Sequence, residues 1–372
     1  NWLRRTGTRV LRDPTAWMHI CFAVDNSSGG GLAGTANAAR VYINGAEDTS
    51  FTTANSNPPS SDTSRMTMQY EHVIGNGAGF NDFKSFYLAE FVIVDGQQLT
   101  PASFGEYDDN GVWIPINVSG LTFGNNGCYL NFKVAPGTGN GAGTDVSGNN
   151  NHFTDVSLTA AQQVTDTCTD DAESIGNFAT WNPLDKDNIT LSNGNLSYSV
   201  GSSNVIRTRA TIAIPSSGKY YYEQTITTDA GSSGTQVGIY DASAAIGNNT
   251  ASGLCRFVHT TTGQKTSQGD GGGGASYGSA FSNGDVAMIA VDMDNNKIWI
   301  GKQGTFFNSG DPAAGSNAMY DDLSGKTWVP ATGTANSSTS QTGTVNFGAT
   351  AFAHTPPTGF KALNTANLPA PT

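Results

Sequence analysis

The chain has 372 residues, enough for two or three domains that each bury a core of their own. Charged side chains make up only 13% of the residues, and 30 acidic against 18 basic side chains give a formal net charge of -12. This charge would repel a phosphate backbone, so we expect no nucleic-acid partner. Glycine contributes 46 residues, and the shortage of helix formers beside so many turn formers predicts an all-β fold with many loops.

No stretch approaches the roughly 20 apolar residues of a membrane span, so we expect no membrane insertion. The chain begins with "NWLRRTG", without Met or a signal peptide, which indicates a fragment or a processed product. The four cysteines, Cys21, Cys128, Cys168 and Cys255, lack the spacing of metal or redox motifs and are interpreted as buried free thiols. A bridge between Cys128 and Cys168 stays open as an alternative.

The first strand candidates lie at residues 16–25, 39–45 and 86–99, with polar loops between them. "VYING" ends the second candidate in Asn44-Gly45, which is a turn signal. We therefore expect residues 16–51 to form a hairpin with a long loop.

These segments resemble the latter half of a laminin-G-like, or concanavalin A-like, β-sandwich. The resemblance rests on Trp17, on the strand that ends at Asp25, and on "VYING", while "AEFVIVDGQQLTPASFGE" (89–106) resembles the last strand of that sandwich and its exit. It implies that residues 1–110 are the C-terminal part of a laminin-G-like sandwich.

Residues 111–185 contain strands that resemble the start of a sandwich, followed by a connector. "YLNF" (129–132) and "DVSGNNNHFT" (145–154) resemble the start of a laminin-G-like sandwich, not its end. Either a second, abbreviated sandwich follows the first, or the later strands complete a shared sheet. Residues 159–185 have no period and predict a connector that packs on a neighbouring domain through Phe178 and Trp181.

Asp145, Asn149 and Asn151 place three oxygen-bearing side chains close together in the chain. Closely spaced oxygen donors suit calcium, but the full set of acidic positions is missing, and the same residue types form any tight turn. We therefore expect no cofactor, with calcium kept as the alternative.

The stretch "GDVAMIAVDMDNNKIWIGKQGTFF" (284–307) predicts a hairpin. A two-residue turn at Asn295-Asn296 would place Asp294 opposite Lys297 and Val291 opposite Ile300. The first strand is apolar on both faces, which is typical of a strand covered on both sides. Trp299 is accordingly expected to pack in a core.

Three separated motifs in this half of the chain resemble a SPRY domain. They are "GKYYYEQTI" (218–226), the hairpin just described, and "VNFGATAFAHTPPTGFKAL" (345–363). The resemblance implies a SPRY-like sandwich at residues 186–365 and a tail at 366–372. Together with the first segment, it predicts an all-β chain of two consecutive antiparallel, jelly-roll-like β-sandwich domains, concanavalin A-like and then SPRY-like.

The candidate binding residues lie on two loops of the second sandwich. Tyr277 stands in "GDGGGGASYGSAF" (269–281), and Tyr320, Asp321 and Asp322 stand in "GSNAMYDDLSG" (315–325). An aromatic ring beside carboxylates suits stacking on a sugar and accepting hydrogen bonds from its hydroxyls. The alternative for each loop is a solvated segment without a ligand.

The sequence predicts no enzyme, because the five histidines begin no metal or triad motif. Glu90, Glu106, Asp108 and Asp109 offer carboxylates for a glycosidase pair, but the Glu-x-Asp-x-x-Glu-like run of the glycanase pattern is not present.

The order of segments resembles the distal part of bacteriophage tail fibres or other virion surface proteins. This resemblance implies a virion protein that recognises a host cell-surface glycan without catalysis, works beside other virion proteins, and forms a homotrimer. Two alternatives stay open: a bacterial adhesin or extracellular glycan-binding module, and a capsid-decorating protein.

Overall fold

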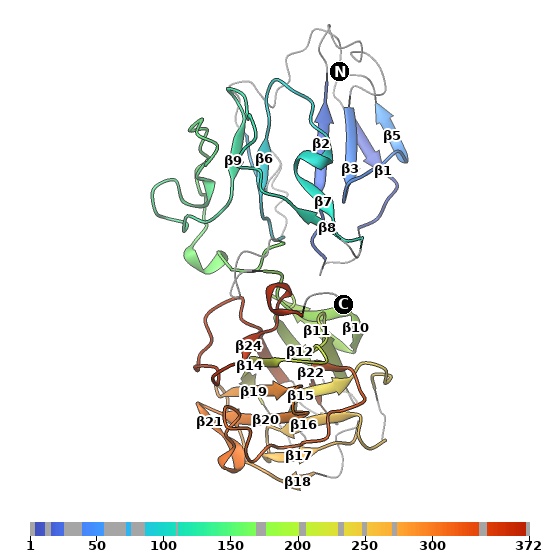
Figure 1. Cartoon of the computed structure of the whole chain (residues 1–372), viewed down its shortest axis with the longest axis vertical. Coiled ribbons are helices and arrows are strands. Elements are labelled where there is room, and N and C mark those ends of the chain that lie inside the picture. The colour runs from blue at the N-terminus through green and yellow to red at the C-terminus, as the bar shows by residue number, and fades with distance from the viewer. Residues whose placement is uncertain are drawn as a thin grey trace. The chain divides into compact units, whose positions relative to one another are not determined.

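The computed structural model describes residues 4–11, 16–25, 39–55, 72–75, 86–108, 111–168, 176–200, 206–229, 234–247, 251–269, 274–334 and 341–369. The chain divides into two compact units, Asn1–Val164 and Thr165–Thr372. Within the described ranges the regular elements are strands, apart from 3-10 turns of three residues each. The predicted all-β fold class is confirmed (Figure 1).

Short antiparallel strands build the first unit. The pairs are β1 (Arg4–Gly7) with β5 (Phe51–Asn55), β2 (Ile20–Val24) with β3 (Ala39–Ile43), β3 with β4 (Ala46–Glu47), β6 (Phe91–Ile93) with β9 (Cys128–Leu130), and β7 (Gly105–Tyr107) with β8 (Trp113–Pro115). The hairpin predicted within residues 16–51 is the pair of β2 and β3, in which Ile20 lies opposite Ile43.

The turn between β3 and β4 follows directly from its sequence. Asn44 and Gly45 have φ values of 48° and 77°, and positive φ at both central residues is what a type I′ turn requires. The side-chain oxygen of Asn44 accepts a hydrogen bond of 2.8 Å from the backbone N–H of His19. A Cβ atom on Gly45 would lie 2.3 Å from the ring of Trp113, so this close approach requires glycine.

Strand β9 connects the later strands of the first unit with the earlier ones. It pairs with β6, with Phe91 opposite Leu130 and Ile93 opposite Cys128. Both β9 residues are buried, at 0% and 1% exposure. The later segment therefore shares a two-stranded sheet with the earlier segment.

Two large sheets build the second unit (Figure 1). The seven-stranded sheet has the order β10 (Trp181–Asp187), β13 (Ile206–Ala210), β22 (Trp328–Thr334), β15 (Thr235–Asp241), β16 (Cys255–His259), β17 (Gln264–Thr266) and β18 (Ala275–Ser276). The eight-stranded sheet has the order β11 (Ile189–Ser192), β12 (Ser197–Val200), β23 (Gln341–Asn346), β14 (Lys219–Thr228), β19 (Val286–Asp292), β20 (Lys297–Lys302) and β21 (Thr305–Phe306), with β24 (Lys361–Ala362) parallel to β14.

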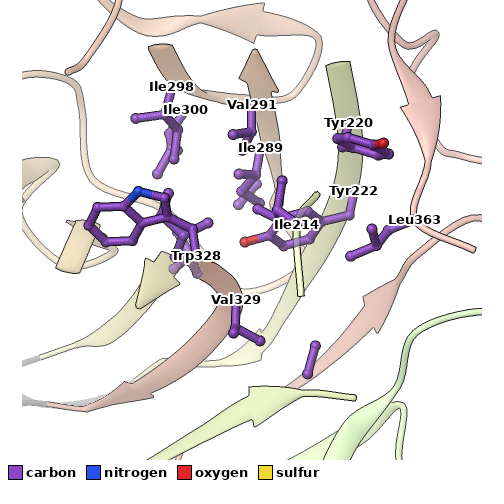
Figure 2. Close-up of a cluster of buried hydrophobic side chains, with 14 of the residues drawn as sticks. Ile214, Tyr220, Tyr222, Ile289, Val291, Ile298, Ile300, Trp328, Val329 and Leu363 are labelled. Carbon is purple, nitrogen blue, oxygen red and sulfur yellow. The ribbon is translucent and has the colours of Figure 1, made fainter. Parts of the chain in front are cut away.

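The main core of the second unit lies between these sheets. Val237 and Trp328 come from the seven-stranded sheet, and Tyr222, Ile289 and Ile300 come from the eight-stranded one. These side chains are buried, and Figure 2 shows most of them directed into one cluster. Burial of each large apolar side chain contributes about 1.5 to 3 kcal/mol. The second unit is therefore a β-sandwich.

The β19–β20 hairpin differs from its predicted register. Asp292, not Asp294, lies opposite Lys297, and Val291 lies opposite Ile298. The turn thus has four residues, because the Asp292 carboxylate accepts hydrogen bonds from the backbone N–H and the side-chain amide of Asn295, at 3.0 and 2.9 Å. The predicted register was wrong, but the predicted faces of the two strands were right. The partner of Val291 moves by two residues, and side chains alternate between the two faces with period two.

Both faces of β19 are buried, as its apolar sequence predicts. Ile289 belongs to the core between the sheets, whereas Met288 and Ala290 pack on the opposite face with Trp299. Trp299 is 0% exposed, and its indole N–H donates a hydrogen bond of 2.7 Å to the carbonyl of Ser316. The prediction that Trp299 packs in a core is confirmed.

Glu223 holds the closing segment of the chain on the outer face of the eight-stranded sheet. Its carboxylate is 3% exposed and accepts hydrogen bonds from the backbone N–H groups of Ala353 and His354, at 2.7 and 2.8 Å. The hydroxyl of Tyr221 donates a third, of 2.8 Å. Phe352 packs on the same cluster as Trp299. The glutamate of "KYYYE" thus connects the first of the three quoted motifs to the last.

Strand β10 begins inside the stretch predicted to be a connector. Phe178 and Trp181 are buried at 2% and 0% exposure, and both lie in the second unit. Trp181 is also the first residue of β10, which pairs with β13. The pairing is irregular between Trp181 and Lys186 and the stretch contains Pro183, so this strand has no alternating pattern to detect.

All four cysteines are free thiols. Cys21, Cys128 and Cys255 are buried, as predicted, whereas Cys168 is partly exposed. The bridge considered between Cys128 and Cys168 is not formed. Burial raises the pKa of the Cys128 thiol to about 11, so this thiol stays protonated at neutral pH.

Candidate functional site

The residues considered as calcium ligands form a hydrogen-bonded turn in the first unit. One Asp145 oxygen accepts from the backbone N–H groups of Tyr129 and Ser147, at 2.8 and 2.9 Å. The other accepts from the Ser147 hydroxyl and the Asn151 N–H, at 3.0 and 2.8 Å. The amides of Asn149 and Asn151 both donate to the carbonyl of Gly127, at 2.9 Å each. These side chains therefore tie the turn to the chain around β9.

We expect Asp145 to make the stability of the first unit depend on acid pH. Burial alone would raise its pKa, but the hydrogen bonds from Tyr129, Ser147 and Asn151 hold the pKa below its ordinary value of 3.8. A lowered folded-state pKa contributes stability above the unfolded value, and this contribution is lost as pH falls through the folded pKa. Asp145→Asn should cost about 1 to 3 kcal/mol at pH 7.

Thermal unfolding, followed by a signal of the first unit at pH values between 2 and 7, checks this expectation. The wild-type melting temperature should fall below about pH 4, and that of Asp145→Asn should start lower and change less with pH. Parallel pH profiles for the two proteins would contradict the role given to Asp145.

The first candidate loop lies at the β18 end of the seven-stranded sheet (Figure 1). Tyr277 follows β18 directly and is half-buried. Its ring meets Phe307 edge-on at a centroid distance of 5.8 Å, and its hydroxyl donates a hydrogen bond of 3.4 Å to the carbonyl of Ile300. The core thus holds Tyr277 in place.

The second candidate loop is fixed to β20. The backbone N–H of Ile298 donates a hydrogen bond of 3.0 Å to the carbonyl of Tyr320. Tyr320 is partly exposed, and the next two residues, Asp321 and Asp322, are exposed. Both oxygens of Asp322 accept from the guanidinium of Arg256, at 2.8 Å each. Because Arg256 is only 4% exposed, Asp322 compensates a buried charge and supports the fold.

Two cations that the sequence reasoning missed bring the candidate loops together. The ammonium of Lys265 on β17 lies 4.7 Å from the ring centroid of Tyr320 and 5.6 Å from that of Tyr277. The guanidinium of Arg256 on β16 lies 4.8 Å from the Tyr320 ring. We call this group the tyrosine site; it comprises Lys265, Tyr277, Tyr320, Asp321, Asp322 and Arg256.

Arg256 had a signal in the sequence, whereas Lys265 had none. Arg256 interrupts the apolar strand "CRFVH", and a charged residue at a buried strand position points to a specific partner. Lys265 stands in the polar stretch "TTGQKTSQG" and is brought to the tyrosines by the pairing of β16 with β17. Only the sheet order reveals this neighbourhood.

The two tyrosines keep neutral hydroxyls at physiological pH. Burial raises the pKa of Tyr277 to about 12, although the hydrogen bond with Ile300 opposes this shift. Burial also raises the pKa of Tyr320 to about 12, with Arg256 acting in the opposite direction. A neutral hydroxyl donates and accepts, while the oxygens of a carboxylate such as that of Asp321 serve as acceptors. The tyrosine site therefore offers both kinds of hydrogen-bonding group.

Two of the carboxylates considered for a glycosidase pair have hydrogen-bond partners in the first unit. Glu90 accepts a hydrogen bond from the hydroxyl of Tyr129. Asp108 accepts one of 2.7 Å from the backbone N–H of Val112. Asp109 lies outside the described residues, and Glu106 is exposed. In the ranges that the structure describes, no group of three or more His, Cys, Asp and Glu side chains is placed to hold a metal ion.

The fold and the site define an all-β chain whose second unit is a β-sandwich with an aromatic and charged site, built by strands β16 and β17 and by the loops that carry Tyr277 and Tyr320. No protein-family model matches the chain, and no curated protein matches it. Among solved structures the chain is similar to the SPRY domain of human HERC1, with 19% identity over 44% of this chain and 96% of that one and a TM-score of 0.37. The architecture given above rests on strand pairing and burial. Across the described ranges, no helix is long and apolar enough to cross a membrane.

Proposed function

We propose that this chain is a non-catalytic surface protein of a bacteriophage virion, in a tail fibre or a related appendage, which binds carbohydrate on the host cell. The observation that carries this proposal is the tyrosine site, where the ammonium of Lys265 lies within 4.7 and 5.6 Å of two tyrosine ring centroids and the exposed Asp321 follows one of these tyrosines in the chain. Sugars stack their apolar faces on aromatic rings and exchange hydrogen bonds with hydroxyls and carboxylates.

The virion setting is supported by the chain's composition and order of segments. Low charge density and many Gly, Asn, Ser and Thr residues give a surface that binds through hydrogen bonds and not through long-range charge. The resemblance of the segments to laminin-G-like and SPRY-like domains in phage fibres supports the same setting.

We propose further that the chain works as a homotrimer among other virion proteins. The affinity of a single sugar-binding site is low. Linking several sites raises the overall affinity for the cell surface by about 10² to 10⁴ over that of a single site. The mass of the intact purified chain in solution tests this proposal. A strict monomer that adsorbs to host cells as well as the virion does would contradict the trimer.

Changing Asp321 or Tyr320 should weaken glycan binding. Asp321→Ala removes an exposed acceptor, and Tyr320→Phe removes a hydroxyl while keeping the ring beside Lys265. Each change should lower affinity for a bound bacterial polysaccharide about 3- to 10-fold, the loss of one hydrogen-bonding group. The melting temperature should stay within about 1 °C, because Asp321 is exposed and Tyr320→Phe keeps the ring that packs against the core.

Calorimetric titration of each variant with the polysaccharide checks this expectation. Glu106→Ala is the matched control, because Glu106 is exposed in the first unit and the substitution changes the net charge by the same amount as Asp321→Ala. Equal affinities for wild type, Asp321→Ala and Tyr320→Phe would remove the tyrosine site from the binding surface. Asp322→Ala is unsuitable for this test, because it leaves the buried Arg256 without its carboxylate.

A further inference from the structure

The tyrosine site is one end of an alternating row of cations and aromatic rings. The guanidinium of Arg256 lies between the rings of Tyr320 and Trp328, at 4.8 and 5.1 Å from their centroids. The ammonium of Lys326 lies 5.7 Å from the Trp328 ring. The row thus consists of Tyr277, Lys265, Tyr320, Arg256, Trp328 and Lys326.

The three cations of this row differ in how their charge is compensated. Arg256 forms a two-pronged ion pair with Asp322, at 2.8 Å. Lys326 forms an ion pair of 2.8 Å with Asp241. Lys265 forms no ion pair with any described carboxylate, and its ammonium donates to the neutral carbonyl of Met319, at 2.7 Å. Lys265 is therefore the one cation of the row that lacks a described counter-charge.

The ammonium of Lys265 has hydrogen-bond donors that can bind an anion. It has three N–H groups, of which the carbonyl of Met319 accepts one. Lys265 is partly buried beside the two tyrosine rings, and a charge that is less screened by solvent interacts more strongly with an opposite charge. Hydrogen bonds between ionised partners are about twice as strong as neutral ones.

We propose that Lys265 binds the anionic group of an acidic sugar unit, a carboxylate or a sulfate. This inference rests on the proposed carbohydrate binding and names the class of saccharide. In this arrangement Asp321 accepts hydrogen bonds from the hydroxyls of the sugar, and Lys265 selects the charged unit. The net charge of -12 repels polyanions at long range, so recognition depends on contact with this one side chain.

The test compares each acidic polysaccharide with its own neutral form. The full chain is titrated with uronate-containing bacterial polysaccharides, native and carboxyl-reduced, and with sulfated ones, native and desulfated. At least one native form should bind about tenfold more tightly than its neutral form, and the pair that shows this preference identifies carboxylate or sulfate. Raising the salt concentration should weaken binding of the native form and leave the neutral form unchanged.

Substitutions of single lysines show which residue causes the preference for the acidic form of the polysaccharide. Lys265→Gln should abolish the tenfold preference and leave the affinity for neutral forms unchanged, whereas Lys265→Arg should keep most of it. Lys186→Gln is the matched control, because it removes the same charge from an exposed lysine whose ammonium also donates to a neutral carbonyl, that of Ile189 at 2.7 Å, and the preference should survive it. Melting temperatures of all variants verify that they are folded.

Three results would overturn the inference. Equal binding of native and neutral forms would refute the anion site while leaving carbohydrate binding intact. An equal loss of the preference in Lys265→Gln and Lys186→Gln would show that net charge, and not the position of Lys265, causes the effect. If no polysaccharide of either kind binds, the proposed function itself fails together with the inference.

Discussion

Trp299→Ala is expected to lower the free energy of unfolding of the second unit by roughly 3 to 5 kcal/mol, the range for emptying a large aromatic site. Trp299 is 0% exposed and packs with Tyr221, Met288 and Phe360 in a cluster on the outer face of the eight-stranded sheet. Its indole N–H also donates to the carbonyl of Ser316 at 2.7 Å, and the substitution leaves that carbonyl without its partner.

Urea unfolding, followed by a signal of the second unit, measures this loss. Trp299→Phe is the intermediate variant, because it keeps an aromatic ring in the cluster and removes the hydrogen bond to Ser316. We expect its loss to be smaller than that of the alanine variant but still measurable. A change within about 0.5 kcal/mol for Trp299→Ala would show that this face of the sheet is not a packed core.

Glu223→Gln is expected to destabilise the second unit by roughly 2 to 4 kcal/mol. The carboxylate accepts from two backbone N–H groups and from the hydroxyl of Tyr221. An amide of the same shape keeps one oxygen and turns the other acceptor into an N–H donor, which then faces a donor in a buried place. A hydrogen bond to a charged group contributes about 1.5 to 3 kcal/mol, and an unpaired buried donor adds a further cost.

The segment around Ala353 should respond first, because Glu223 is its anchor on the sheet. Limited proteolysis of Glu223→Gln should therefore cut near residues 347–360 faster than in wild type. Glu106→Gln is the control, an equal substitution at an exposed glutamate. Unchanged proteolysis together with an unchanged melting temperature would contradict the anchoring role.

The framework of the second unit was predictable from its sequence because its strands carry strong local signals. β19 is apolar on both faces and is buried on both. The turn that follows was mispredicted, because Asp292 caps it through its own side chain and lengthens it to four residues. Side-chain capping competes with the backbone turn types that an Asn-Asn pair suggests, and sequence alone does not rank them.

The candidate site was predictable in part for a similar reason. Tyr277 and Tyr320 are separated by 42 residues of sequence, and their shared partner Lys265 lies on a third segment. Composition identified aromatic residues and carboxylates on loops, but the order of β16, β17 and β18 in the sheet decides which of them meet. The structural role of Asp322 depends on the buried charge of Arg256, which no local pattern connects to it.

The central claim is that the chain binds a host-surface polysaccharide without cleaving it. Size-exclusion chromatography with light scattering, applied to a panel of bacterial surface polysaccharides incubated with the full chain, tests both parts at once. We predict that at least one polysaccharide elutes together with the protein and is recovered at its original length. Shortened polysaccharide, formed by wild type and not by a variant with a single Asp or Glu replaced, would contradict the non-catalytic role, and the absence of any co-eluting polysaccharide would contradict binding.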